Sequence, residues 1–288
     1  MDKRWSIERA GPVSSKLRIP YRKANDWEQW LLISSDRHID NPHSLLDLQR
    51  YHLEQAKERD AIVMDFGDLF DAMQGKTDRR SSKADLRRDL DASKAYLNGL
   101  VEYAADFLAP YVNNIALISK GNHETAVANK IEYDLHDGLL YALANRGGRH
   151  IINGGFRGWV SLLFETAGKN GGTGNRRSKN IAYHHGYGGG GPVTKGVIQA
   201  NRKAVYLSNA DYVFSGHIHE SWIFPITRVR LAQSGREVAE TQYHVCLPTY
   251  KEEYVEHGGG WHHETGKPPK PTGAWWARFY YSNRTKDI

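Results

Sequence analysis

The stretch Ala-Ile-Val-Met-Asp-Phe-Gly-Asp-Leu-Phe-Asp, residues 61–71, places an apolar run directly before a glycine and two carboxylates. Its first six residues have the length and composition of a buried parallel strand. Asp68 follows at the carboxyl end of that strand, where open α/β sheets bind their ligands. Its carboxylate could bridge two hard cations through its two oxygens. Asp71 could take part in the same site, or it could serve only as a helix N-cap or turn residue.

Four other strand-like runs, at 30–34, 115–119, 181–183 and 212–214, are also followed by potential metal ligands. These are Asp36 and His38, Asn122 and His123, His184 and His185, and His217 and His219. On an extended backbone, side chains two apart face the same side, so Asp36 and His38 could share one cation. His217 and His219 have the same spacing and could supply one imidazole to each of two metals.

Each of these motifs is weak alone, because a solvated strand end, a turn or a helix start explains it as well. Five consecutive strand ends that each deliver Asp, Asn or His predict a common metal centre. The set contains no sulfur, and the single Cys246 cannot build a thiolate site. The unperturbed pKa of histidine, about 6.5, suits His123 for general acid work, and Glu124 could orient its imidazole.

The order of elements predicts an α/β fold. Helical periodicity appears at 44–59 and 89–108, between the strand-like runs. After about residue 150 the pattern changes to shorter strands, and 222–229, 241–247 and 275–281 are further candidates for a second sheet. The Gly-rich and basic segment 167–180 is expected to be a loop. We expect one domain over 1–288, with 220–288 completing the second sheet and contributing a Gly/Pro/His-rich loop at 257–273.

The composition is that of an ordinary globular protein. The chain has 288 residues, 40% of them hydrophobic and 25% charged, which is enough to bury a sizeable core. Its apolar runs stay well short of the ~18 residues of a membrane helix, and its start lacks the apolar stretch of a signal peptide. We therefore expect a cytoplasmic protein without a membrane partner. The formal charge of +6 raises the odds of a polyanionic partner.

In order and composition, the five blocks resemble the signature of calcineurin-like metallophosphoesterases. They are Asp36-Arg37-His38, Gly67-Asp68-Leu69-Phe70-Asp71, Gly121-Asn122-His123-Glu124, His184-His185-Gly186 and Gly216-His217-Ile218-His219. The resemblance spans residues 36–219. It implies a four-layer α/β/β/α sandwich of two mixed β-sheets flanked by helices, with a two-metal site at the carboxyl ends of the central strands. It also implies a metal-dependent phosphoric ester hydrolase.

The resemblance further implies a role for each block. One metal would be bound by Asp36, His38, Asp68 and His219, and the other by Asp68, Asn122, His185 and His217. Asp68 would then be the bridge, and His123 would protonate the leaving oxygen while a metal-bridging hydroxide attacks phosphorus in line. His185 is chosen over His184 because it directly precedes Gly186, which leaves His184 beside the metals or facing the substrate. The cofactors would be two divalent ions, with Mn expected and Fe, Zn, Co or Mg as alternatives.

The substrate is predicted from weaker features. Gly67-Asp68-Leu69-Phe70-Asp71 is similar to the block of the DNA-repair nuclease branch, which favours a phosphodiesterase acting on DNA or a nucleotide. Basic residues at 76–88 and 176–179 support a nucleic-acid substrate, although a solvated helix face explains the first cluster equally well. Tyr187 could stack on a base. The alternatives are a phosphomonoesterase on a small molecule or phosphoprotein, and a binding module without catalysis. Protein partners are not predicted.

Overall fold

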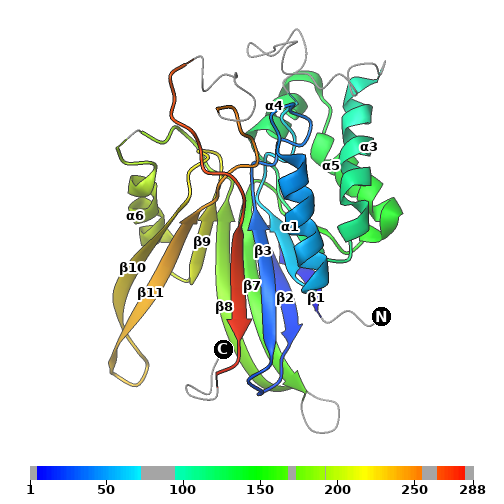
Figure 1. Ribbon diagram of the computed structural model, residues 1–288. Coiled ribbons are helices and arrows are strands. Elements are labelled where there is room, and N and C mark those ends of the chain that lie inside the picture. The colour runs from blue at the N-terminus through cyan, green and yellow to red at the C-terminus, as the bar shows by residue number, and fades with distance from the viewer. Residues whose placement is uncertain (1–4, 73–94, 168–172, 192, 255–264, 283–288) are drawn as a thin grey trace.

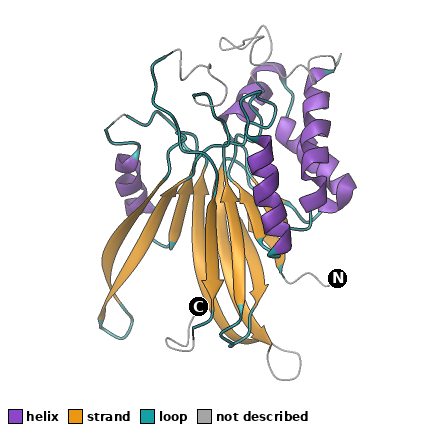
Figure 2. Ribbon diagram, viewed as in Figure 1, coloured by secondary structure: helices purple, strands orange, loops and turns teal. Residues whose placement is uncertain are grey.

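Two β-sheets form the centre of the molecule, with helices on their outer faces (Figure 1 and Figure 2). The computed structural model describes residues 5–72, 95–167, 173–191, 193–254 and 265–282. Both sheets contain parallel and antiparallel pairs. The predicted α/β/β/α arrangement of two mixed sheets flanked by helices is therefore confirmed.

The larger sheet has seven strands in the order β1-β2-β7-β8-β9-β11-β10. Their bounds are β1 (Ser6–Gly11), β2 (Ser14–Pro20), β7 (Arg157–Ala167), β8 (Thr173–His184), β9 (Tyr212–Ser215), β11 (Glu237–Cys246) and β10 (Trp222–Leu231). At its centre β9 runs parallel to both β8 and β11. The carboxyl ends of these three strands therefore meet at one edge of the sheet.

The smaller sheet has five strands in the order β12-β3-β4-β5-β6. Their bounds are β12 (Trp275–Tyr280), β3 (Glu28–Ser34), β4 (Ile62–Asp65), β5 (Ile115–Ile118) and β6 (Ile152–Asn153). Strands β3 to β6 are parallel, and β12 adds an antiparallel edge. The segment after residue 220 thus contributes to both sheets, since β10 and β11 belong to the larger one.

Helices cover the two outer faces unequally. Those on the side of the smaller sheet are α1 (Leu46–Glu58), α3 (Tyr96–Leu108), α4 (Asn122–Ile131) and α5 (Leu135–Leu143), and the short turns η2 (Ala109–Tyr111) and η3 (Ala144–Gly148) follow α3 and α5. The larger sheet carries α6 (Val197–Tyr206) at its β10 end, on the left in Figure 1.

Alternation along the strands sorts the core into layers. On β3, Leu31 and Ile33 point between the sheets, whereas Leu32 packs with the helices. On β4, Met64 belongs to the inter-sheet layer and Val63 to the helix layer. Both faces of these strands are buried, which is why their sequences read as continuous apolar runs.

The prediction of a loop at 167–180 is wrong for residues 173–180. They continue β8 and pair with β7, with Arg176 opposite Glu165. The Nε atom of Arg176 lies 2.8 Å from Glu165, so the cross-strand ion pair accommodates the charge within the ladder. These basic residues stand at the start of β8, away from its carboxyl end, and so do not surround the metal ligands as expected. The basic cluster at 76–88 and the loop histidines at 257–263 lie outside the described residues.

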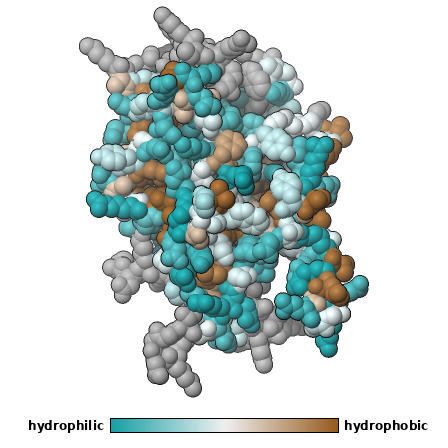
Figure 3. Space-filling model, turned by 180° about the vertical axis from the view of Figure 1, so that it is seen from behind, coloured by the Kyte–Doolittle hydropathy of each residue, from teal (hydrophilic) through white to brown (hydrophobic). Residues whose placement is uncertain are grey.

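Strands β10 and β11 form a ten-residue hairpin ladder that projects from the sheet. It protrudes at the lower right of Figure 3, with polar and apolar residues mixed on its surface. Within the residues described, the structure contains no helix with the length and hydropathy needed to cross a membrane.

Candidate metal centre

The ligand candidates stand on turns that directly follow strand ends. Asp36 and His38 follow β3, Asp68 follows β4, and His217 and His219 follow β9. The prediction that Asp36 and His38, and likewise His217 and His219, lie on an extended backbone is wrong, because these four residues, and Asp68 as well, have φ between 44° and 72°. Their side chains converge through left-handed turns rather than through strand alternation.

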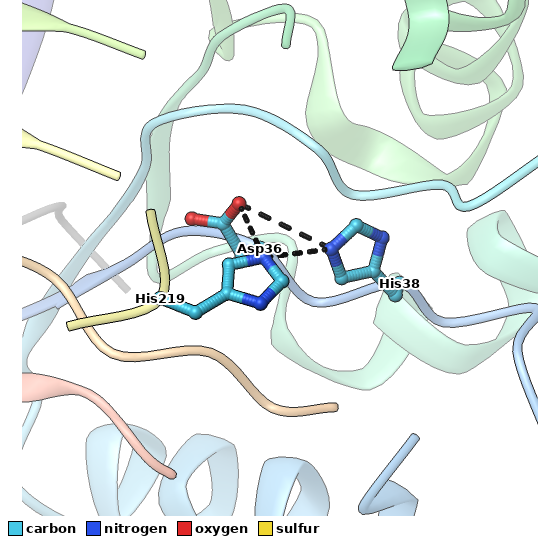
Figure 4. A group of neighbouring side chains, drawn as sticks. All are labelled: Asp36, His38 and His219. Carbon is cyan, nitrogen blue, oxygen red and sulfur yellow. Dashed lines mark hydrogen bonds and ion pairs between the residues drawn. The ribbon is translucent and has the colours of Figure 1, made fainter. Parts of the chain in front are cut away.

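The first cluster joins Asp36 and His38 to His219 (Figure 4). The Nε2 atom of His219 lies 3.2 Å from Oδ1 of Asp36 and 3.3 Å from Nε2 of His38. Asp36 and His38 are buried and His219 is partly exposed. One carboxylate oxygen and two imidazole nitrogens thus lie close enough together to bind one cation. The cluster is open to solvent on the side of His219.

The second cluster joins Asp68, His185 and His217, with Asn122 between the two imidazoles. The Nε2 atom of His185 lies 3.1 Å from both Oδ2 of Asp68 and Oδ1 of Asn122. The Nδ1 atom of His217 lies 2.6 Å from the same asparagine oxygen. The structure therefore brings together, in two neighbouring groups, the seven residues predicted as metal ligands.

Each cluster takes residues from both sheets. In the first, Asp36 and His38 come from the smaller sheet and His219 from the larger one. In the second, Asp68 and Asn122 come from the smaller sheet, and His185 and His217 come from the larger one. The backbone N–H of His217 also donates to Oδ2 of Asp36 at 2.9 Å, so the two sheet ends are tied together directly.

A hydrogen bond and a close carboxylate contact at the far side of the imidazoles orient two of the histidines. The Nδ1–H of His185 donates to the carbonyl of Phe66 at 2.9 Å, and Nδ1 of His38 lies 3.1 Å from Oδ1 of Asp71. Each arrangement directs Nε2 into its cluster, as metal-binding histidines require. Nitrogen and oxygen donors that converge without sulfur fit borderline and hard divalent cations.

The pKa values also suit a cation. Burial would raise the pKa of Asp68 and of Asp36, but neighbouring histidines outweigh it and lower the pKa, to about 2 for Asp36. Burial would lower the pKa of His185, yet Asp68 raises it to about 10. The carboxylates therefore stay ionised, and metal binding must displace a proton from His185.

His123 lies beside the second cluster at the start of α4. Its Nδ1–H donates to the carbonyl of Asp71 at 2.6 Å, and its Nε2 lies 3.8 Å from Oδ2 of Asp68. The backbone N–H of His123 donates to the other oxygen of Asp68 at 3.0 Å. Asp71 thus positions both His38 and His123, which is more than the cap or turn role that its place in the sequence suggested.

Glu124 has a different place from the one proposed for it. Its two carboxylate oxygens accept from the backbone N–H groups of Phe70, at 2.9 Å, and Gly121, at 2.7 Å. It therefore joins the start of α4 to the loop after β4, while Asp71 holds the His123 ring. Sequence reasoning missed Asp40, whose buried carboxylate accepts from the N–H groups of Asp71 and Ala72 at 2.6 and 2.8 Å. Its closeness to Asp36 and His38 was the available signal.

The paired histidines at the end of β8 point apart. His185 is fully buried in the second cluster, whereas His184 is partly exposed and accepts at Nδ1 from the N–H of Gly186 at 2.9 Å. The ring of Tyr187 stands edge-on to His184, with centroids 5.7 Å apart. Tyr187 is half-exposed, and its hydroxyl donates to Gln199 at 2.8 Å.

A cleft of about 550 Å³ opens above the second cluster. Its floor contains Asp68, Asn122 and His123, together with His217 and His219. Its sides are formed by glycines 188–190 and by residues 266–270. A substrate in this cleft has access to His123, to His219 of the first cluster, and to Asp68, Asn122 and His217 of the second.

Of three comparisons with known proteins, only the match to a family model bears on this site. A search among curated proteins found no match. A crystal structure of a conserved uncharacterised protein from Streptococcus pneumoniae TIGR4, described as a predicted phosphoesterase, aligns over 77% of this chain and 74% of its own. The identity is 12% and the TM-score 0.28, too distant to bear on the fold or the function. The family model described as calcineurin-like phosphoesterase matches residues 30–221, which include all the ligand candidates. The chain therefore belongs to the calcineurin-like phosphoesterase family and is a metal-dependent phosphoric ester hydrolase.

Proposed function

We propose that this chain is a two-metal phosphodiesterase that acts on nucleic acid or a nucleotide, with Mn²⁺ as the preferred cation. The observation that carries the proposal is the pair of neighbouring ligand clusters, with His123 beside them and with His219, Asp68, Asn122 and His217 lining one cleft. When bound, two divalent cations supply an activated water and stabilise the charge that develops on the phosphoryl oxygens.

The residues of the chain take separate roles. Asp36, His38 and His219 would hold one cation, Asn122, His185 and His217 would hold the other, and Asp68 would contribute its carboxylate to both. The bond from Nδ1 of His123 to the Asp71 carbonyl fixes the ring and leaves Nε2 to give its proton to the leaving oxygen. His184 and Tyr187 lie outside both clusters and are proposed to contact the substrate.

The first test compares bis-p-nitrophenyl phosphate with p-nitrophenyl phosphate, with Mn²⁺ present or chelated. We expect the wild-type protein to prefer the diester and to lose activity on chelation. Asp68→Ala should lose both metal and turnover. A preference for the monoester would instead identify a phosphomonoesterase, and inactivity with every divalent metal would favour a binding module.

His123→Ala provides the sharpest test of the proposed role of His123 as the general acid. The variant should keep its metal content, because the ligands of both clusters remain, yet lose turnover by about 10²- to 10⁴-fold. Metal content is measured by elemental analysis and turnover with the diester. Wild-type turnover in this variant would remove the general-acid assignment.

Cleavage of linear single- and double-stranded DNA then tests the natural substrate. Mn-dependent product release that is absent in Asp68→Ala would identify a nuclease. If only the small diester is hydrolysed, nucleotides become the substrates to examine.

A further inference from the structure

Three lysines border the cleft without taking part in the proposed hydrolysis. Lys195 follows the glycine-rich side of the cleft, whereas Lys267 and Lys270 belong to the opposite side at 266–270. We call these three residues the lysine wall. The first and the last of them, Lys195 and Lys270, are 75 residues apart in the sequence. The fold brings them to the same cleft as Asp68 and His123.

Glu220 holds two of the lysines beside the metal centre. The Nζ atom of Lys270 lies 2.6 Å from Oε1 of Glu220, and Nζ of Lys195 lies 3.8 Å from Oε2. Glu220 is buried and directly follows His219. The backbone of Lys195 is fixed as well, because its carbonyl accepts from Nε1 of Trp222 at 2.9 Å. Both ammonium groups are therefore held at defined positions next to a proposed ligand.

Lys195 and Lys270 share one carboxylate, that of Glu220, so this pair carries a net positive charge. Lys267 adds a third ammonium group to the described lining of the cleft. Partial burial and then Lys270 lower the pKa of Lys267, while Glu253 opposes that shift. An anion between the ammonium groups of Lys267 and Lys270 would offset their electrostatic repulsion.

The cleft is also larger than one phosphate group requires. At about 550 Å³ it falls within the range of roughly 300–1,000 Å³ that accommodates whole ligands of moderate size. A phosphate at the metal centre therefore leaves room for further parts of the substrate. Those parts extend along a surface whose charged groups are mainly lysines.

We infer that the lysine wall binds phosphates that neighbour the scissile one, so that the substrate is a polynucleotide chain rather than a mononucleotide or an isolated diester. The inference rests on the proposed phosphodiesterase function. Lysine and arginine contacts with backbone phosphates are independent of base sequence and decrease with salt. The enzyme should therefore favour longer chains without a strong preference for sequence.

The experiment compares three diesters: bis-p-nitrophenyl phosphate, the dinucleotide TpT with one phosphate, and an eight-residue oligothymidylate. Wild-type protein with Mn²⁺ should show a higher kcat/KM for the oligomer than for TpT. In the double variant Lys195→Gln/Lys267→Gln, the ratio of kcat/KM for the oligomer to that for bis-p-nitrophenyl phosphate should fall about tenfold, mainly through KM. Both substituted lysines are exposed, so the variant should fold.

Salt dependence gives a second readout. In the wild type, log(kcat/KM) for the oligomer should fall with log[salt]. In the double variant the fall should be less steep, by about 0.7 in slope for each removed lysine that contacts a phosphate. Lys16→Gln serves as the matched control, because it removes one exposed charge from β2 in the larger sheet. It should keep the wild-type ratio and slope.

The outcomes separate the two proposals. Hydrolysis of none of the three diesters overturns the phosphodiesterase function and the lysine wall together. Hydrolysis of bis-p-nitrophenyl phosphate with equal kcat/KM for TpT and the oligomer overturns the lysine wall alone. A double variant that keeps the wild-type ratio and salt slope would also overturn the lysine wall alone.

Discussion

Five of the seven proposed ligand residues adopt a backbone conformation that costs about 1–2 kcal/mol in a residue with a side chain. Hydrogen bonds from neighbouring turns hold it. The N–H of Asp36 donates to the Gly67 carbonyl at 2.8 Å, and that of His38 donates to the Asp68 carbonyl at 3.1 Å. The carbonyl of Asp36 accepts from Oγ1 of Thr249 at 2.9 Å. Strain of this kind persists where the surrounding structure imposes it, and here it fixes the donors in advance.

The adjacent histidines 184 and 185 allow a test with a built-in control. His185→Ala should lose the metal of the second cluster, because its Nε2 faces both Asp68 and Asn122. His184→Ala should keep both metals, since its ring faces Tyr187 instead. Elemental analysis after dialysis measures the difference. The assignment is wrong if His184→Ala is the variant that loses metal.

At the scale of the elements, glycines let the loops after the strands approach one another closely. A Cβ atom on Gly216, just after β9, would lie 2.1 Å from Oγ of Ser35 and 2.4 Å from Oδ2 of Asp36. Gly216→Ala should therefore displace Asp36 and lower metal content and turnover together. Gly189→Ala is the control for metal content, because a Cβ there meets no atom within 4 Å. Full metal binding by Gly216→Ala would show that the loops can separate without loss of the site.

Helix α6 buries Lys203 against β11, where His244 is also buried. Burial, Lys203 and Arg228 lower the pKa of His244 to about 4. The unfolded chain takes up this proton near pH 6.5, whereas the folded chain does so only near pH 4. The contribution of neutral His244 to stability is thus fully present above pH 6.5 and is lost as the pH falls toward 4.

Urea denaturation of the metal-free protein at pH 7 and pH 5 measures this contribution. The free energy of unfolding should fall between the two pH values, and it should fall less in His244→Gln, which cannot take up the proton. Chelator in every sample keeps metal release from contributing. An equal loss in both proteins would contradict the assignment.

Apolar runs predicted the strands that lead into the site, because β3, β4 and β5 are buried on both faces. The chemistry after each strand end then predicted which side chains converge. The strand at 173–180 was not predictable from its Gly and Arg content, since pairing with β7 and the ion pair of Arg176 with Glu165 come from tertiary structure. The left-handed turns and the place of Glu124 likewise depend on hydrogen bonds between distant loops.

At the scale of the whole molecule, the two ligand clusters connect the sheets at one end of the sandwich. Because each cluster has residues from both sheets, metal binding should stabilise the sandwich as a unit. A cation at 100 times its Kd contributes about 2.7 kcal/mol if it binds only the folded chain. Thermal unfolding should therefore occur at higher temperature with Mn²⁺ than with chelator.

His219→Ala should show a smaller shift on adding Mn²⁺, since the first cluster then lacks its residue from the larger sheet. An unfolding temperature that does not respond to Mn²⁺ in the wild-type protein would mean that the folded chain does not bind the ion in preference to the unfolded chain, and it would contradict the assignment of the clusters.

The β10–β11 hairpin begins beside Glu220 and turns back at 232–236, ten residues along the strand. At about 3.3 Å per residue, its tip is roughly 30 Å from the cleft. Ser234 in that turn is exposed, and Gly235 next to it has open space around it. The tip is therefore a place to attach a fluorophore or a surface tether, so that single enzyme molecules can be immobilised with the cleft turned toward solution.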